Sequence, residues 1–135
     1  MRKVLLAAFV VLLGAFAGVS AFADAIPIGK FFSNGSATVG QVVQIVAPAT
    51  NVNGLYLRTA QLQVWSTNSG VAVFASPTAP ANCCDASTRN IFEMASGVGG
   101  VSQNLPNQLF IPAGMGIWIG ANGSVGWELT YDLQQ

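Results

Sequence analysis

The sequence is 135 residues long and only 7% of it is charged, against about a quarter in an ordinary soluble domain. No basic cluster follows Lys3, which excludes phosphate-driven binding of nucleic acid. Histidine is absent, and this excludes imidazole metal sites, catalytic triads and the usual general base near neutral pH. We therefore expect no enzyme, no metal site and no cofactor.

Residues 1–23 have the pattern of a secretory signal peptide, with a basic start at Arg2-Lys3 and the cleavage-type triplet Ala21-Phe22-Ala23 at the end of an apolar run. The alternative is a retained membrane anchor, because residues 4–23 carry no charge and are just long enough to span a bilayer. Either interpretation predicts an apolar helix ahead of one secreted or extracytoplasmic domain, residues 24–135. Contact with a membrane is expected only if the anchor is retained.

Short apolar segments separated by turn residues predict about eight strands in that domain. Their spacing near ten residues is typical of an all-β sandwich or a small barrel, and we expect a single sandwich of antiparallel strands. In chain order the predicted strands are Gln41–Ala47, Leu55–Thr59, Gln61–Trp65, Val71–Ala75, Ile91–Met94, Gln108–Ile111, Met115–Gly120 and Val125–Leu133.

Asparagine and glycine mark the predicted turns. Asn34-Gly35 predicts a turn before the first strand, and Asn68-Ser69-Gly70 predicts a hairpin. Asn122-Gly123 predicts a second hairpin that ends the chain, because both residues accept positive φ. The Gly/Ser-rich segment Ala95–Gln103 is expected to be flexible. In the last strand one parity is apolar and should face inward: Val125, Trp127, Leu129, Tyr131 and Leu133.

The segment Leu109–Gly114, followed by Ile117–Ile119, resembles the strand–turn–strand of jelly-roll proteins, including cupins. Pro112 ends one strand and Gly114 supplies a conformation that other residues resist. The resemblance implies a jelly-roll arrangement of sheets, whereas the histidine ligands of metal-dependent cupins are missing. More broadly, the run of short uncharged strands is similar to small jelly-roll subunits of virions and surface appendages.

Cys83 and Cys84 are adjacent, and no third cysteine exists in the chain. A bond between neighbours is strained, because ordinary disulfides place Cα atoms about 5.5 Å apart and consecutive Cα atoms lie about 3.8 Å apart. Three outcomes remain in an oxidising compartment: a strained vicinal disulfide, bonds to cysteines of neighbouring subunits, or free thiols.

Paired acids are the remaining route to catalysis. Glu128 and Asp132 share one face of a strand, with Cα atoms about 13 Å apart at the usual rise per residue. Glycosidase carboxyl groups lie closer, at roughly 5 to 10 Å. We therefore interpret both as solvated acids.

Three aromatic residues are candidates for surface contacts. Tyr56 and Trp65 lie off the apolar parity of their strands, and Trp118 lies between Ile117 and Ile119. Exposed rings suit sugar stacking or contacts between subunits. The alternative is that both faces of each sheet are covered and these rings belong to the core.

These observations favour an exported structural subunit that assembles with copies of itself in a virion, fibre or surface layer. The reason is that a surface so poor in charge repels other copies weakly. The alternative is an extracellular module that binds carbohydrate or another ligand through Tyr56 and Trp65.

Overall fold

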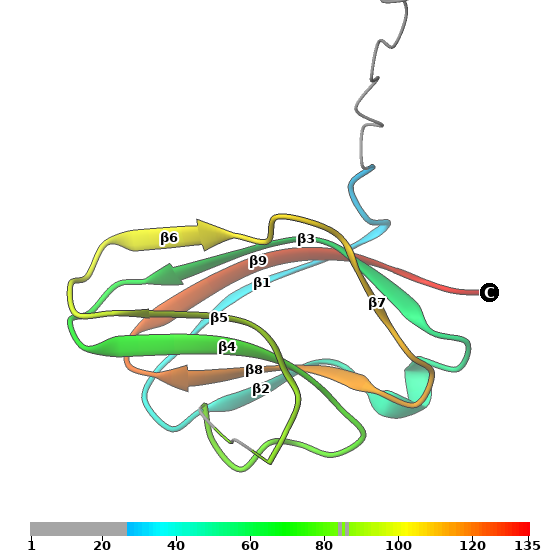
Figure 1. The fold of residues 1–135 in the computed structure, drawn as a ribbon, viewed down its shortest axis with the longest axis horizontal. Coiled ribbons are helices and arrows are strands. Elements are labelled where there is room, and N and C mark those ends of the chain that lie inside the picture. The colour runs from blue at the N-terminus through cyan, green and yellow to red at the C-terminus, as the bar shows by residue number, and fades with distance from the viewer. Residues whose placement is uncertain (1–26, 84, 86) are drawn as a thin grey trace, which may run out of the picture.

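The computed structural model describes residues 27–83, 85 and 87–135, which form two antiparallel sheets (Figure 1). The helix predicted within residues 1–23 lies outside this part of the chain. The described residues form no helix that is long and apolar enough to cross a membrane. The elements are β1 (Phe31–Ala37), β2 (Val42–Val46), the 3₁₀ turn η1 (Pro48–Thr50), β3 (Leu55–Val64), β4 (Ser69–Ser76), β5 (Asn90–Ser96), β6 (Val101–Asn104), β7 (Leu109–Ile111), β8 (Gly116–Asn122) and β9 (Val125–Leu133).

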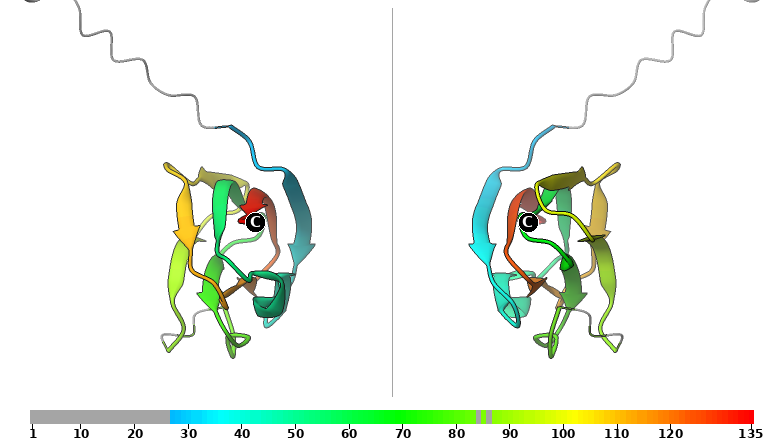
Figure 2. Two further views of the ribbon diagram at one scale, coloured as in Figure 1. Left: turned by 90° about the vertical axis from the view of Figure 1, so that its right-hand side faces the viewer. Right: turned by 90° about the vertical axis from the view of Figure 1, so that its left-hand side faces the viewer.

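The chain alternates between the two sheets at most of its connections. One sheet has the order β1-β9-β3-β6, with β7 pairing the first residues of β3, and the other has the order β2-β8-β4-β5. Figure 2 shows the two layers from either end. These orders are those of a jelly roll. The predicted all-β sandwich is therefore confirmed, with nine strands in the described residues where about eight were expected.

The core lies between the sheets and consists of the inward parity of each strand. Burial of each large aliphatic side chain contributes about 1.5–3 kcal/mol. On β9 the predicted parity is confirmed, since Val125, Trp127 and Leu129 are buried and Tyr131 and Leu133 are partly buried. Side chains no more than 1% exposed include Leu55, Leu57, Leu62, Val64, Val71, Val73, Ile117, Ile119, Val125 and Leu129.

Both predicted hairpins are wrong. β9 pairs with β1 and β3, whereas β8 pairs with β2 and β4, so the turn at Asn122-Gly123 carries the chain from one sheet to the other. The turn that contains Asn68 (φ 52°) likewise joins β3 to β4 across the two sheets. The reason is that alternation identifies the buried face of a strand but not its partner. Two strands with inward apolar faces can therefore lie opposite each other across the core.

The two strands predicted at Leu55–Thr59 and Gln61–Trp65 are one strand, β3. A register shift between Leu57 and Thr59 inserts one extra residue against β9. A bulge of this kind moves the buried set to the other parity. It explains how Leu57 and Leu62, on opposite parities in the sequence, both point into the core.

One more local prediction is wrong, because Asn34-Gly35 lies inside β1 and is not a turn. Gly35 is needed there for packing, since a Cβ atom would lie 2.5 Å from Cζ2 of the Trp127 indole. The segment Ala95–Gln103 contains the end of β5 and most of β6, and its expected flexibility stays a prediction.

Candidate functional site

The outer face of the five-stranded sheet carries a row of polar side chains that runs across four strands. Asn34 on β1 is the register partner of Glu128 on β9, which in turn is the partner of Gln61 on β3. Gln61 is the partner of Asn104 on β6. Directly opposed residues have Cβ atoms about 4.5–5.5 Å apart, so three amides and one carboxylate form a continuous strip.

Trp65 lies beside this strip and is 49% exposed. Its six-membered ring lies over Gly126 of β9, where a Cβ atom would be 2.4 Å from Cζ2. The missing side chain of Gly126 therefore makes room for the ring on the sheet. The indole Nε1–H donates to Oε1 of Gln63 at 3.0 Å, which fixes the ring's orientation.

A chain of amide hydrogen bonds continues from the indole into the strip. Nε2 of Gln63 donates to Oε1 of Gln61 at 3.2 Å. An indole nitrogen can only donate, so the direction of each bond in the chain follows from the first. The amide group of Gln61 is thus held with its NH₂ end turned away from Gln63.

Two hollows open along the face and meet at Glu128. One, of about 240 Å³, lies between Trp65, Gln63 and Asn34. The other, of about 430 Å³, extends from Glu128 past Thr59 and Phe32. The face therefore offers an elongated groove, and among the described residues that line it Glu128 is the only charged one.

An ionic and aromatic cluster lies at the far end of the same sheet. Tyr56 contacts Phe110 with ring centroids 5.2 Å apart, and the guanidinium of Arg58 lies 4.9 Å from the Tyr56 centroid. Nε of Arg58 is 2.7 Å from Oδ2 of Asp132, whose Oδ1 accepts the backbone N–H of Lys30 at 2.6 Å. The Lys30 backbone donor and then Arg58 lower the pKa of Asp132 below its usual range.

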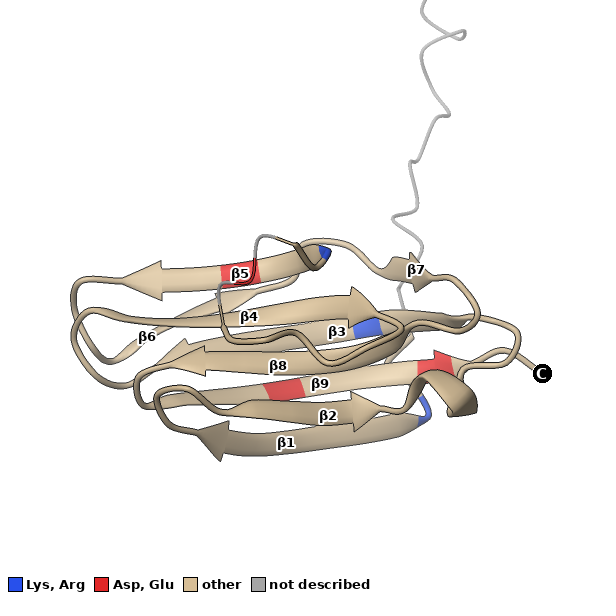
Figure 3. Cartoon of the chain, turned by 90° about the horizontal axis from the view of Figure 1, so that it is seen from below, with Lys and Arg blue, Asp and Glu red and all other residues tan. Residues whose placement is uncertain are grey.

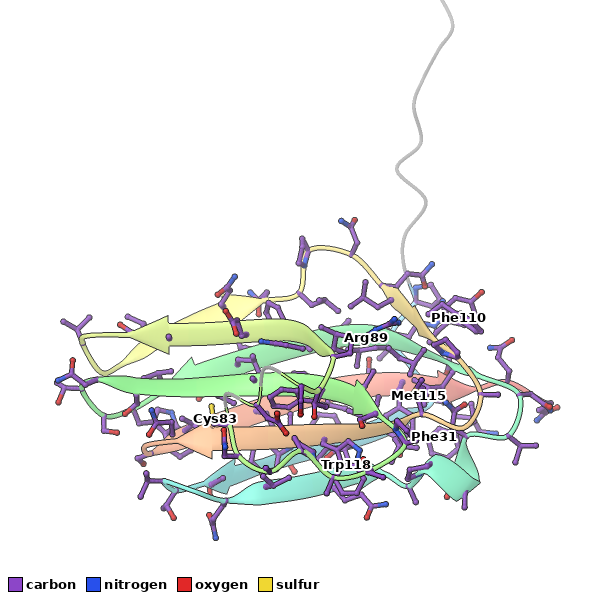
Figure 4. All side chains as sticks on the ribbon, turned by 60° about the horizontal axis from the view of Figure 1, so that its bottom comes forward. Phe31, Cys83, Arg89, Phe110, Met115 and Trp118 are labelled. Atoms are coloured by element: carbon purple, nitrogen blue, oxygen red, sulfur yellow. The ribbon has the colours of Figure 1, made fainter. Side chains whose placement is uncertain are left out.

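The outer face of β4 and β8 in the four-stranded sheet is packed against the β4–β5 connection, of which the structure describes residues 77–83, 85 and 87–89. Phe74 of β4 is 1% exposed and packs with Cys83 and Trp118. Nε1 of Trp118 donates to the Ser76 carbonyl at 3.1 Å. In Figure 4 the connection passes across β8, with Cys83 labelled on the connection and Trp118 labelled on the strand. The structure therefore places Tyr56 and Trp65 on one outer face and Trp118 on the other.

The β4–β5 connection is closed by a carboxylate. Asp85 accepts the backbone N–H groups of Ala81 and Ser87, both at 2.9 Å, and the hydroxyl of Thr88 at 3.1 Å. These donors, Ala81 first, hold the pKa of Asp85 well below its usual range.

Cys83 is buried and its thiol lies 3.6 Å from the Gly70 carbonyl. Cys84 lies outside the described residues, so the outcome for the cysteine pair remains a prediction.

The β1–β2 flank, defined as β1, β2 and the turn Thr38–Gln41, is one side of the sandwich, where both strands are sheet edges and contact each other. It contains no charge and no proline. Phe32 and Val39 on it are 62% and 70% exposed. Figure 3 shows how sparsely charged positions are placed along the strands, with none on β1 or β2.

Glu128 and Asp132, the two acids that the sequence places on one strand face, lie in different surroundings. Among the residues that the structure describes, no three His, Cys, Asp or Glu side chains are placed to hold a metal ion. Asp132 is bound by Arg58, and Glu128 stands among amides.

The sequence analysis identified Trp65 but missed the strip of amides beside it. Gln61 and Gln63 alternate with apolar residues, and this alternation indicates a polar face.

Fold and surface together define a jelly-roll sandwich in which the β4–β5 connection covers part of one outer face, and the other outer face is open and carries few charges. No protein-family model and no curated protein sequence matches the chain. Solved structures of infectious bursal disease virus match weakly, the Gt strain with 12% identity and a TM-score of 0.35, and the Gx strain with 16% and 0.33. The matches cover 77% and 79% of this chain, which spans 30% of each viral chain. The weak resemblance to virion proteins suggested by the sequence is confirmed, and at this level it carries no information on function.

Proposed function

We propose that the protein is an exported, non-enzymatic structural subunit that associates with copies of itself. The observation that carries the proposal is the uncharged, open edge of β1. An edge strand presents unpaired backbone N–H and C=O groups to any other edge, and monomeric proteins usually protect such edges with charge, proline or a bulge. β1 has no charge, no proline and an unbroken register over its seven residues.

The rest of the flank supports the same contact. Val39 and Phe32 flank the edge with exposed apolar surface, and burial of such surface favours association. The described residues carry only seven charges, two of which, Arg58 and Asp132, form an ion pair. Repulsion between copies is therefore weak. We propose that β1 pairs with an edge strand of a second copy and extends the sheet across the contact.

Export is the second part of the proposal and stands on the N-terminal sequence pattern. A basic start, an apolar run and a small-residue triplet precede the domain. The assembly would then form outside the cytoplasm, on a cell surface, in a periplasm or in a virion.

Size-exclusion chromatography with light scattering tests the contact. In the full chain, the double substitution Val39→Lys/Gln44→Lys places two charges on the β1–β2 flank, where Gln44 is exposed on β2, and should reduce the mass to that of a monomer. The matched control is Val52→Lys/Val98→Lys, which adds the same charge at valines 71% and 62% exposed elsewhere and should leave the mass unchanged. A monomeric wild-type chain, or equal effects of both pairs, would contradict the proposal.

A further inference from the structure

The groove on the outer face of the five-stranded sheet suggests a ligand. Its lining includes Asn34 and Phe32 of β1 but neither Val39 nor Gln44, the two positions substituted in the test of association. We propose that this groove binds a neutral oligosaccharide, with one sugar ring stacked on Trp65 and the following units laid along β9 towards Thr130. This site is additional to the structural role proposed above and does not depend on it.

Trp65 has the properties of a stacking platform. One face of its ring is supported by the backbone at Gly126 and its Nε1 is held by Gln63, while 49% of the residue remains exposed. A large ring fixed in place loses little conformational entropy when a ligand binds. Pyranose rings present flat patches of C–H groups, which pack against aromatic faces while their hydroxyls stay free to form hydrogen bonds.

The strip beside the ring offers donors and acceptors in a fixed arrangement. The bonds from Trp65 through Gln63 leave the NH₂ group of Gln61 as a donor. Glu128, its register partner, is exposed and supplies acceptor oxygens next to that donor. A sugar hydroxyl both donates and accepts, so alternating amide and carboxylate groups match a pair of neighbouring hydroxyls.

The charge of the groove selects neutral sugars. No basic residue in the part of the chain that the structure describes lines either hollow, and the guanidinium of Arg58 is engaged by Asp132. A sulfated or carboxylated glycan would find no counter-charge and would be repelled by Glu128. From Gly126 to Thr130 the groove runs four residues along β9, about 13 Å at the usual rise of a strand, which requires an oligosaccharide and not a single sugar.

The Trp65 end of the groove is a poor candidate for the contact between copies. The cores of protein–protein interfaces are rich in apolar and aromatic groups, whereas the strip beside Trp65 consists of Asn34, Glu128, Gln61 and Asn104, and the exposed ring of Phe32 lies in the other hollow. Amides and one acid around an aromatic ring fit a hydroxyl-rich ligand better.

Isothermal titration calorimetry of the full chain tests the proposal, with cellohexaose, chitohexaose, xylohexaose and maltohexaose as probes. At least one probe should bind saturably at millimolar concentration, and Trp65→Ala should weaken that binding by about tenfold, which is the loss of one aromatic contact. The matched control is Phe110→Ala, an aromatic residue of similar exposure (53%) at the far end of the same sheet. It should change affinity by less than about twofold, because Phe110 lines neither hollow of the groove.

A second variant keeps the test decisive if Trp65→Ala does not fold. Gly126→Thr introduces a strand-forming residue whose Cβ displaces the ring of Trp65, and it should weaken binding as Trp65→Ala does while the chain keeps its thermal unfolding temperature. The proposal is overturned if none of the four probes binds, or if Phe110→Ala weakens binding as much as Trp65→Ala. It is also overturned if Trp65→Ala leaves sugar binding intact and lowers only the assembled mass, since the ring would then be a contact between copies.

Discussion

The substitution Gly120→Ala tests whether the β4–β5 connection packs firmly against the four-stranded sheet. A Cβ atom on Gly120 would lie 2.6 Å from Cα of Cys83 and 3.1 Å from Cε2 of Phe74. Because the closest contact is backbone, Gly120→Ala must lift the connection from β8. Uncovering Phe74 costs about 1.5–3 kcal/mol, and replacing a strand glycine by alanine restores about 0.5–1 kcal/mol. The free energy of unfolding should therefore fall by about 1–2 kcal/mol.

Gly70→Ala is the matched control, because Gly70 lies in the same sheet with its nearest neighbour, the Met94 carbonyl oxygen, at an ordinary 3.5 Å. Urea denaturation should place the midpoint of Gly120→Ala below the wild type and that of Gly70→Ala at or above it. A thermal scan should show Gly120→Ala melting lower by about 5 °C or more. If the two variants are equally stable, the connection does not cover Phe74 in solution and the reasoning is refuted.

Two further predictions concern stability. Asn51 is buried, and its Nδ2 donates to the Pro112 and Met115 carbonyls at 2.7 and 2.8 Å, so Asn51→Ala should lower the free energy of unfolding in urea by about 2 kcal/mol. Asn51→Asp should lower the free energy of unfolding by more than Asn51→Ala does, because carboxylate oxygens would face the two carbonyl oxygens. An equal or smaller loss for Asn51→Asp would contradict this. The native structure lowers the pKa of Asp85 and Asp132, so the stability that they contribute is complete above the unfolded-state pKa of about 3.9 and is lost as the pH falls below it. The urea midpoint should decrease steadily from about pH 4 downward, and a midpoint independent of pH in that range would refute this assignment.

The buried face of most strands could be predicted from the sequence, because alternation is a local property. Val125, Trp127 and Leu129 illustrate this on β9. The apolar run of β4 places apolar residues on both parities, which indicates that both of its faces are covered. Phe74 is covered on its outer side by the β4–β5 connection.

Strand partners could not be predicted, because they depend on contacts between residues far apart in the chain. Asn34, Glu128 and Gln61 form one row only through the registers of β1, β9 and β3, and no local pattern encodes those registers. The same limit explains the two mistaken hairpins. Asn-Gly indicated a place where the chain turns, and the turn crosses between sheets because each flanking strand finds its neighbours elsewhere.

The proposal that the β1 edge joins copies of the protein is tested most directly by amide hydrogen exchange at several protein concentrations. The account predicts that exchange in β1, Phe31–Ala37, slows as concentration rises, because its unpaired N–H groups become hydrogen-bonded in the assembly. Exchange in β5, an edge strand on the other side of the sandwich with a charged residue, Glu93, should stay constant. Exchange in β1 that does not depend on concentration would contradict the account.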